Sequence, residues 1–393
     1  MITKIELMNF KSHAHTVIEP GPGRVTAIVG PNGCGKTSLL QAVHCLTRTK
    51  NEPWDQVFKG RLAFENLGAK KSCPTKIALH SRGALRWQIS VESDTDLTDG
   101  EWKPSVTLLS WNVREDIIDN VENLSLPKGR SITNSVPAAK AILSLPHSFY
   151  FKASSEKLAE PSYSDPIPPI LEADGKGLAA VIAHLVLSFP EQVSTIEDSL
   201  RRIVPTIKKI GARLAKVKVK EKKLFSTGTT QMAYDEEREV TGQELFFNTT
   251  SADSLPAFAM SDGTLLVLGL LTLLYSPNTS DPFAAPKLIL LDDIEAGLHP
   301  LAQRQLMQML KDFAEKHNRQ IILTSHSPYI IDELDAKDVW VMATDKEGIS
   351  HTKRLSDHPD AKRALDVLTT GELWDAEGEA WVLEDTPAEL VNA

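Results

Sequence analysis

A glycine-rich segment near the start of the chain has residues that can bind a polyphosphate. Residues 30–37 read Gly-Pro-Asn-Gly-Cys-Gly-Lys-Thr and stand between a predicted strand at 24–29 and a predicted helix at 36–46. In this setting glycines let backbone N–H groups wrap phosphates at a helix N-terminus, Lys36 reaches the β and γ phosphates, and the Thr37 hydroxyl holds Mg²⁺. The segment therefore predicts a phosphate-binding loop, with contacts from Asn32, Gly33, Cys34, Gly35, Lys36, Thr37 and Ser38. The Cys34 thiol lies at the positive end of a helix, so we expect it to be acidic, although a bystander role is favoured over redox control.

A second cluster of chemically active residues follows an apolar strand. Residues 288–291 read Leu-Ile-Leu-Leu and end in Asp292 and Asp293. A carboxylate at the end of a buried strand is costly unless a cation or hydrogen bonds compensate it. The phosphate-binding loop supplies that cation, because Mg²⁺ held by Thr37 would also bind Asp292 through water.

Predicted strands and helices alternate at both ends of the chain. Strands are predicted at 2–9, 24–29, 76–80, 85–91, 105–110, 288–291, 320–324 and 339–343, with further strands within 207–247. Helices are predicted at 36–46, 177–187, 192–203, 261–275 and 300–316. This order predicts an α/β core with an antiparallel β layer, whose two halves are separated by an inserted middle.

Composition narrows the class of protein. The chain has 393 residues, of which 41% are apolar, and its 43 basic and 52 acidic side chains give a net charge of −9. A core of real size can form, and disorder and a small disulfide scaffold are excluded. The longest apolar run, residues 265–275, is too short to cross a bilayer, and the first residues do not resemble a signal peptide. We expect a cytoplasmic protein with no membrane contact.

The order of the motifs resembles that of ABC-class P-loop ATPases, in the branch that includes RecF, SMC and overcoming-lysogenisation-defect proteins. Five motifs carry the resemblance: Asn9-Phe10-Lys11-Ser12, the phosphate-binding loop, Ser261-Asp262-Gly263-Thr264, Asp292 to Pro300, and Thr324-Ser325-His326-Ser327-Pro328. The resemblance implies ATP and Mg²⁺ as ligands, with Lys11 and Ser12 beneath the adenine.

The resemblance also implies that two copies complete each other's sites. Ser261, Asp262, Gly263 and Thr264 look like the signature turn that approaches the γ-phosphate held by a second protomer, and His326 looks like the switch histidine. A Ser hydroxyl at a helix N-terminus makes an anion site, which fits this role. Taken alone, a histidine after a buried strand would more often be a core residue.

The chain departs from the pattern of this group in three places. The acid after the magnesium-binding Asp is usually Glu and here is Asp293, so we expect Asp293 to polarise water, with Glu295 as substitute or interface partner and slow turnover. Asp262 and Thr264 stand where transporter ATPases have Gly and Gln, which makes a transporter ATPase a weak alternative. No glutamine is placed as the magnesium-sensing residue: Gln88 lies on a predicted strand, and residues 150–158 are the other candidates.

The inserted middle separates branches within the group. A long coiled coil requires sustained apolar heptads, and prolines at 161, 166, 168, 169, 190 and 205 interrupt them here. We therefore predict a compact helical and β insertion. The predicted parts are an N-terminal lobe at 1–135, the insertion at 136–250, a C-terminal lobe at 251–345 and an acidic tail at 346–393.

Two charged regions indicate partners. Lys216, Lys218, Lys220 and Lys222 share one face of a predicted strand, which could follow a nucleic-acid backbone. Lysines that protect a strand edge from aggregation are a slightly favoured alternative. After Arg363 the tail has acids, two tryptophans and no basic residue, which suits docking on its own core or on a basic protein.

These observations predict an ATP-binding and ATP-hydrolysing protein that dimerises or forms a higher homo-oligomer head to head around ATP. We expect it to be the ATPase or sensor subunit of a DNA-repair or anti-phage defence system with a separate effector protein. The alternative is an ATP-stabilised scaffold that hydrolyses little and recruits the effector.

Overall fold

The computed structural model describes residues 1–49, 52, 54–59, 68, 75–81, 86–91, 145–227, 230–276 and 286–384, and at 54–55, 86, 89–91 and 220–236 it describes the backbone alone. The strand predicted at 105–110 lies outside these residues. The chain forms two compact units: Met1–Tyr150, Ala284–Ile294 and Met307–Ala393 make the first, and Phe151–Phe283 and Glu295–Leu306 make the second. Among the described residues, no helix has both the length and the apolar composition to cross a membrane.

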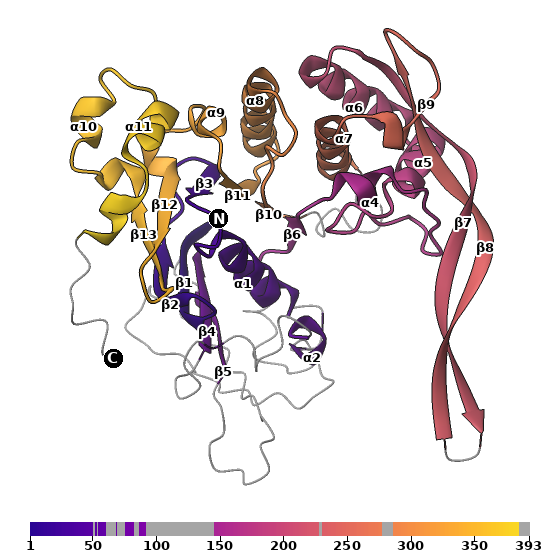
Figure 1. Ribbon diagram of the computed structural model, residues 1–393, viewed down its shortest axis with the longest axis horizontal. Coiled ribbons are helices and arrows are strands. Elements are labelled where there is room, and N and C mark those ends of the chain that lie inside the picture. The colour runs from indigo at the N-terminus through magenta and orange to yellow at the C-terminus, as the bar shows by residue number, and fades with distance from the viewer. Residues whose placement is uncertain are drawn as a thin grey trace. The chain divides into compact units, whose positions relative to one another are not determined.

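A six-stranded sheet forms the centre of the first unit (Figure 1). Its order is β13 (Ser350–Arg354), β12 (Val339–Thr344), β3 (Val25–Val29), β11 (Gln320–Ser325), β10 (Leu288–Leu291) and β6 (Ser148–Phe151). β12, β3, β11 and β10 run parallel and are almost wholly buried, as expected for apolar runs with no alternation. Because parallel strands end at one edge, the residues that follow β3, β10 and β11 meet there.

An antiparallel sheet forms a second layer of this unit. Its order is β2 (His13–Ile18), β1 (Ile2–Phe10), β4 (Thr75–Ser81) and β5 (Arg86–Val91). The structure thus confirms the predicted antiparallel layer. Strand β2 was not predicted, because three of its first four residues, His13–Thr16, are polar; it follows β1 after a two-residue turn.

Helix α1 (Lys36–Arg48) packs against strands of both sheets. Its apolar face enters one core cluster with side chains from the two layers: Ile5, Leu7, Ile28, Leu39, Leu40, Val43, Leu46, Ile77, Leu79, Leu290 and Ile322. Each of these buried side chains contributes roughly 1.5–3 kcal/mol by leaving water. The first turn of α1 is thereby fixed at the end of β3.

Short elements complete the first unit. They are α2 (Trp54–Val57), α9 (Pro328–Ile331), η5 (Ala336–Asp338), η6 (Leu355–Asp357), α10 (Ala361–Ala364), α11 (Thr370–Glu377) and η7 (Ala380–Leu383). Trp381 of η7 is buried against His358, with ring centroids 4.9 Å apart, and its carbonyl accepts a hydrogen bond from Lys353. The described part of the acidic tail therefore docks on its own core.

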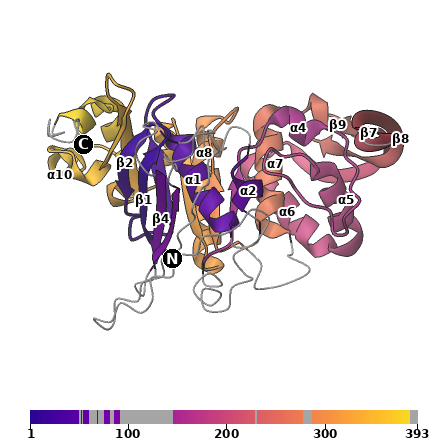
Figure 2. The ribbon, with the colours of Figure 1, turned by 90° about the horizontal axis from the view of Figure 1, so that it is seen from below.

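The second unit combines helices with a long β-hairpin. Its helices are α4 (Ser155–Ala159), α5 (Leu178–Ser188), α6 (Pro190–Ile203) and α7 (Asp262–Tyr275), and Figure 2 shows α5, α6 and α7 grouped together. Helix α7 is apolar on nearly all sides, so it is surrounded by α4, α5 and α6. The predicted boundary at residue 251 puts α7 in the C-terminal lobe, whereas its packing on α4, α5 and α6 groups it with the inserted region. Helix α8 (Pro300–Lys316) begins in this unit and ends in the first.

The hairpin consists of β7 (Ile207–Thr227) and β8 (Thr230–Thr249), followed by β9 (Leu255–Pro256) and η4 (Ala257–Ala259). Its base packs on α5 and α6, and the two strands continue beyond these helices (Figure 1). The register places Lys218 opposite Glu239, Lys220 opposite Glu237 and Lys222 opposite Asp235. Among the side chains that the structure describes on this hairpin, Lys216 forms an ion pair with Glu239 at 2.6 Å. A nucleic-acid track along the lysines of β7 stays a prediction.

Candidate nucleotide-binding site

The phosphate-binding loop has the backbone that its glycines predict. Gly30, Gly33 and Gly35 have φ values of 146°, 81° and 108°, which side-chain-bearing residues rarely adopt. A Cβ at Gly30 would lie 2.1 Å from the carbonyl oxygen of Met342 on β12. Gly35 is the N-cap of α1 and supplies no side-chain cap, so the first N–H groups of the helix stay available to an anion.

The Lys36 side chain lies against the backbone of the phosphate-binding loop. Its ammonium donates hydrogen bonds to the carbonyl oxygens of Gly30 at 2.9 Å and Pro31 at 2.8 Å, and the residue is 6% exposed. These bonds hold the charge at the mouth of the loop before any phosphate arrives. Asn32 and Gly33 are exposed, while Thr37 and Ser38 are half-buried in the first turn of α1.

Cys34 is not the acidic thiol that its position at a helix start predicts. The residue is 1% exposed, and this burial raises the pKa of the Cys34 thiol above its ordinary value, although Lys36 acts in the opposite direction. Desolvation outweighs the helix terminus and the neighbouring ammonium. The expectation of an acidic thiol is therefore wrong, and the bystander role gains support.

Two further side chains, which no sequence motif indicated, bond to backbone carbonyls of the loop and support it. His13 on β2 bonds the Gly35 carbonyl through Nε2 at 3.1 Å and the Thr16 hydroxyl through Nδ1 at 2.9 Å. Burial lowers the pKa of His13 to about 4, so the ring is neutral and Nε2 carries the proton that Gly35 accepts. Ser350 on β13 donates to the carbonyl oxygen of Cys34 at 2.7 Å.

Asp292 lies where β10 ends and is surrounded by hydroxyl groups. Its carboxylate accepts hydrogen bonds from Thr37 at 2.8 Å, Thr324 at 2.6 Å and Tyr150 at 2.9 Å, and the residue is 4% exposed. The predicted pair Thr37 and Asp292 is thus brought together across 255 positions of sequence. A carboxylate and a hydroxyl beside a phosphate-binding loop are the oxygen donors that Mg²⁺ prefers, so the residues present fit that ion.

Tyr150 contacts Asp292 and belongs to the segment that holds the other candidates for the magnesium-sensing position, a role that stays a prediction. It lies on β6, within the segment 150–158 named as a candidate, and its ring stacks on His44 with centroids 5.7 Å apart. Burial, and then the charge of Asp292, raises the pKa of Tyr150 well above its usual range, so the hydroxyl stays a hydrogen-bond donor. Gln88 lies instead on β5, opposite Ala78 in the antiparallel sheet.

Asp293 and His326 approach each other at the ends of β10 and β11. Their closest side-chain atoms, Oδ1 and Nε2, are 4.0 Å apart, and both side chains are partly exposed. Asp293 has a φ of 55°, and its N–H donates to the Thr324 hydroxyl at 3.0 Å. This left-handed conformation, uncommon for a residue with a side chain, turns the chain just after the strand.

Lys11 and Ser12 form the turn between β1 and β2. Lys11 has a φ of 52°, its ammonium donates to Gln41 on α1 at 2.9 Å, and burial lowers its pKa. The Ser12 hydroxyl lies within hydrogen-bond distance of the Ser350 hydroxyl, at 2.7 Å. Both residues therefore stand beside the loop and the side chains that support it.

The signature residues form the start of α7 in the second unit. Ser261 is the N-cap, and its hydroxyl accepts from the Thr264 N–H at 3.3 Å and lies 2.8 Å from the Thr264 hydroxyl. Asp262 is exposed in the first turn. A Cβ at Gly263 would lie 2.5 Å from the carbonyl oxygen of Gly297, so the missing side chain lets the two backbones touch. Glu295 lies in the turn that precedes Gly297, where its carbonyl accepts from the Leu298 N–H.

A protein-family model described as "AAA domain, putative AbiEii toxin, Type IV TA system" matches residues 25–332. The chain belongs to this family. The match includes the phosphate-binding loop, the signature turn, Asp292 and His326, which identifies an ABC-type P-loop ATPase of the RecF and SMC group. ATP, usually with Mg²⁺, is the ligand that such a family implies.

Curated relatives match over short stretches. "Retron Ec83 probable ATPase" of Escherichia coli is 31% identical over 96 residues, which cover 23% of this chain and 17% of the relative. "DNA replication and repair protein RecF" of Prosthecochloris aestuarii is 39% identical over 49 residues, or 12% of this chain and 13% of RecF. "Chromosome partition protein Smc" of Chlorobaculum tepidum is 55% identical over 42 residues, or 11% and 4%. The chain therefore matches less than a fifth of the length of each of these relatives.

Solved structures show the same fold over most of the chain. The crystal structure of an Smc head bound to the C-winged helix domain of ScpA matches with a TM-score of 0.53 and 16% identity, covering 92% of this chain and 99% of that one. An Smc head with an extended coiled coil, bound to the C-terminal domain of ScpA derived from Pyrococcus furiosus, gives a TM-score of 0.50 and 13% identity, covering 93% and 98%. These likenesses confirm the predicted ABC-type fold.

Proposed function

We propose that this protein binds ATP with Mg²⁺, closes head to head with a second copy and hydrolyses the nucleotide. The observation that carries the proposal is the meeting of Asp292, Asp293 and His326 with Thr37 at one end of the parallel sheet. Phosphate groups would lie on the N–H groups of the loop and on Lys36. Mg²⁺, held by Thr37 and Asp292, would supply positive charge to the β and γ oxygens.

The residues next to Asp292 would act on water. Asp293 and His326 would orient a water molecule whose oxygen attacks the γ-phosphorus, while the bond to the β-phosphate oxygen breaks and ADP leaves. The proton released from water passes to one of these two side chains. Ser261 at the start of α7 would approach the γ-phosphate held by the second copy, because an N-cap hydroxyl beside helix N–H groups binds an anion.

One observation favours a second candidate, an ATP-stabilised scaffold with little hydrolysis. Asp293 is one methylene shorter than the Glu usual in this group, and its carboxylate stays 4.0 Å from His326, beyond hydrogen-bond length. Both candidates require ATP binding, so loss of binding cannot separate them. Loss of the carboxylate can.

The separating experiment is ATP hydrolysis by the whole chain and by Asp293→Asn, with molar mass measured by light scattering in ATP. If Asp293 is catalytic, the variant loses about 100-fold or more in rate and accumulates as an ATP-bound dimer. Asp357→Asn, an exposed aspartate on η6, is the matched control and should keep the parental rate. A variant that keeps its rate and forms no additional dimer contradicts the catalytic assignment and leaves the scaffold.

A DNA-repair or anti-phage role with a separate effector is the proposed setting. The similarity to a retron ATPase and to RecF over short stretches supports it. Cells carrying the chain with its neighbouring genes should lose protection against phage or DNA damage on Lys36→Ala. Adding duplex DNA to the hydrolysis assay tests the lysines of β7, since stimulation that fades with salt indicates phosphate contacts.

A further inference from the structure

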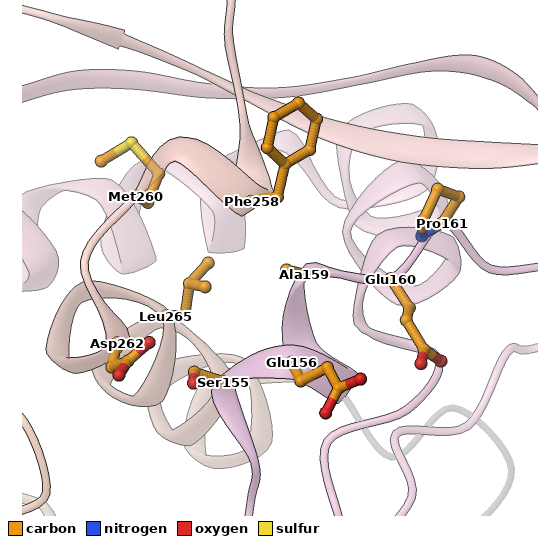
Figure 3. Close-up of a pocket in the computed structure, with 9 residues that line it drawn as sticks. All are labelled: Ser155, Glu156, Ala159, Glu160, Pro161, Phe258, Met260, Asp262 and Leu265. Carbon is orange, nitrogen blue, oxygen red and sulfur yellow. The ribbon is translucent and has the colours of Figure 1, made fainter.

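A pocket of about 440 Å³ lies beside the start of α7 in the second unit. Figure 3 shows the side chains around its opening, which come from α4, from η4 and from the first turns of α7. The lining residues are Ser155, Glu156, Ala159, Glu160, Pro161, Phe258, Met260, Asp262 and Leu265. Asp262 directly follows the signature serine, so one wall of the pocket is the signature helix itself.

One part of the pocket is apolar and carries an exposed aromatic side chain. Leu265 is 2% exposed, whereas Phe258 on η4 is 78% exposed. An exposed Phe beside an apolar pocket is typical of a surface that binds another protein. Folding of the second unit gives no reason for it, because the side chain buries little against its own chain.

The rest of the rim is negatively charged. Glu156, Glu160 and Asp262 contribute carboxylates, and the nearby ammonium of Lys157 is already bonded to Glu160 at 2.6 Å. Acids in the first turns of α4 and α7 also stabilise those helix starts, which accounts for Glu156 and Asp262. Glu160, at the other end of α4, is held by its ion pair with Lys157, so three carboxylates of the rim stand against one nearby ammonium.

We infer that this pocket is a docking site for a segment of a partner protein that presents an arginine or lysine beside an apolar side chain. The cation pairs with the rim carboxylates and lies against Phe258, while the apolar neighbour covers Met260 and Leu265. Nucleic acid and free nucleotide are repelled by the same carboxylates. The chemistry therefore selects a basic and apolar peptide.

Binding of a partner segment in this pocket would be sensitive to whether the signature turn contacts ATP held by a second copy. The link to nucleotide rests on the proposed function, in which Ser261 engages ATP held by a second copy, and the docked segment contacts the residue next to Ser261. Docking itself needs no nucleotide, so it can be tested apart from that function.

The test selects binders from a display library of random 12-residue peptides on the whole chain without nucleotide. Enriched peptides should pair Arg or Lys with Leu, Phe or Trp, and a synthetic copy of one should bind the chain in fluorescence anisotropy. Phe258→Ser should weaken that peptide at least tenfold, and Glu156→Gln with Glu160→Gln should do the same and reduce the salt dependence. An enriched set that is acidic, or that binds both variants as well as the parent, overturns the inference, and so does the absence of enrichment.

Two controls isolate the pocket. Leu187→Ser changes an 85% exposed apolar residue on α5 of the same unit and should leave peptide affinity within twofold. Lys36→Ala should also leave it unchanged, because Lys36 belongs to the other unit. If Lys36→Ala loses ATP binding and keeps peptide binding, the docking site is independent of nucleotide binding. Each proposal can then be contradicted without the other.

Discussion

The starts of α1 and α7 are both predicted to face phosphate, yet they are built differently. Gly35 caps α1 without a side chain, and Lys36 adds a charge held by two loop carbonyls. Ser261 caps α7 with its own hydroxyl, which accepts from the Thr264 N–H, and Asp262 adds a carboxylate in the first turn. The first helix start leaves its N–H donors open, whereas the second already satisfies one of them.

This difference indicates that the start of α1 binds free nucleotide, whereas the start of α7 contacts a phosphate that is already bound. The α1 site has open donors and a cation, so it can bind a polyphosphate unaided. The α7 site has one donor fewer and a like charge beside it, so it would gain little from an anion free in solution. It would contact a phosphate that another site already holds and has partly neutralised, which is the proposed role of the signature turn between two copies.

The largest effect is expected from removing the charge at α1. Lys36→Ala should weaken ATP binding about 100-fold or more, because loss of a buried, hydrogen-bonded charge that pairs with phosphate costs about 3 kcal/mol. Titration calorimetry with ATP and Mg²⁺ measures it. Lys346→Ala, an exposed lysine in the turn after β12, is the matched control and should bind as the parent does. Equal affinities in the two variants would remove the α1 site from nucleotide binding.

A smaller and different effect is expected at α7. Ser261→Ala removes the N-cap, which costs about 1 kcal/mol of stability, and it removes the hydroxyl offered to the second copy. ATP affinity of the single chain should stay within twofold, while the ATP-dependent dimer measured by light scattering should decrease.

Ser261→Asn separates the two consequences of that substitution. Asn caps helices as well as Ser does, so it restores the stability of α7, but its larger amide should not restore the dimer. If Ser261→Ala keeps a full ATP-dependent dimer, the signature turn does not act between copies, and the comparison of the two helix starts loses its functional meaning.

The sequence predicted the α1 site more completely than its surroundings. The loop needs glycines at fixed spacing, and strands such as 288–291 and 320–324 are apolar runs without alternation, so local patterns reveal them. No local pattern assigns a role to His13 or distinguishes Tyr150 from the other candidates at 150–158, because the residues that they contact lie far from them in the sequence. Tyr150 reaches Asp292 across 142 positions and His13 reaches Gly35 across 22, and only packing of the sheets reveals such contacts. The prediction of a low pKa for the Cys34 thiol was wrong for the same reason, because the loop sequence does not show that the side chain is buried.

A pH-dependent effect on stability is expected at His13, which supports the loop before α1 through the Gly35 carbonyl. Burial lowers the folded-state pKa of His13 to about 4 from 6.5, and the buried ring is also near the charge of Lys11. Because the unfolded chain binds the proton first as pH falls, the parent loses stability between about pH 6.5 and pH 4, by an amount on the order of 3 kcal/mol. His13→Gln has no titrating ring, so the stability difference between parent and variant should be largest above pH 6.5 and shrink toward pH 4.

Urea unfolding at pH 7, 5.5 and 4.5, followed by tryptophan fluorescence, measures this difference. The tryptophans whose side chains the structure describes, at 87, 340, 374 and 381, belong to the first unit, so their signal reports the unit that contains His13. His44, whose pKa burial also lowers to about 4, titrates in parent and variant alike and cancels from the difference. A difference that stays constant with pH would mean that folding does not shift the pKa of His13, and a difference that grows toward pH 4 would mean that the folded chain holds the ring charged. Either result would contradict a neutral His13 that donates to the Gly35 carbonyl. Another contact would then have to hold Gly35 at the start of α1.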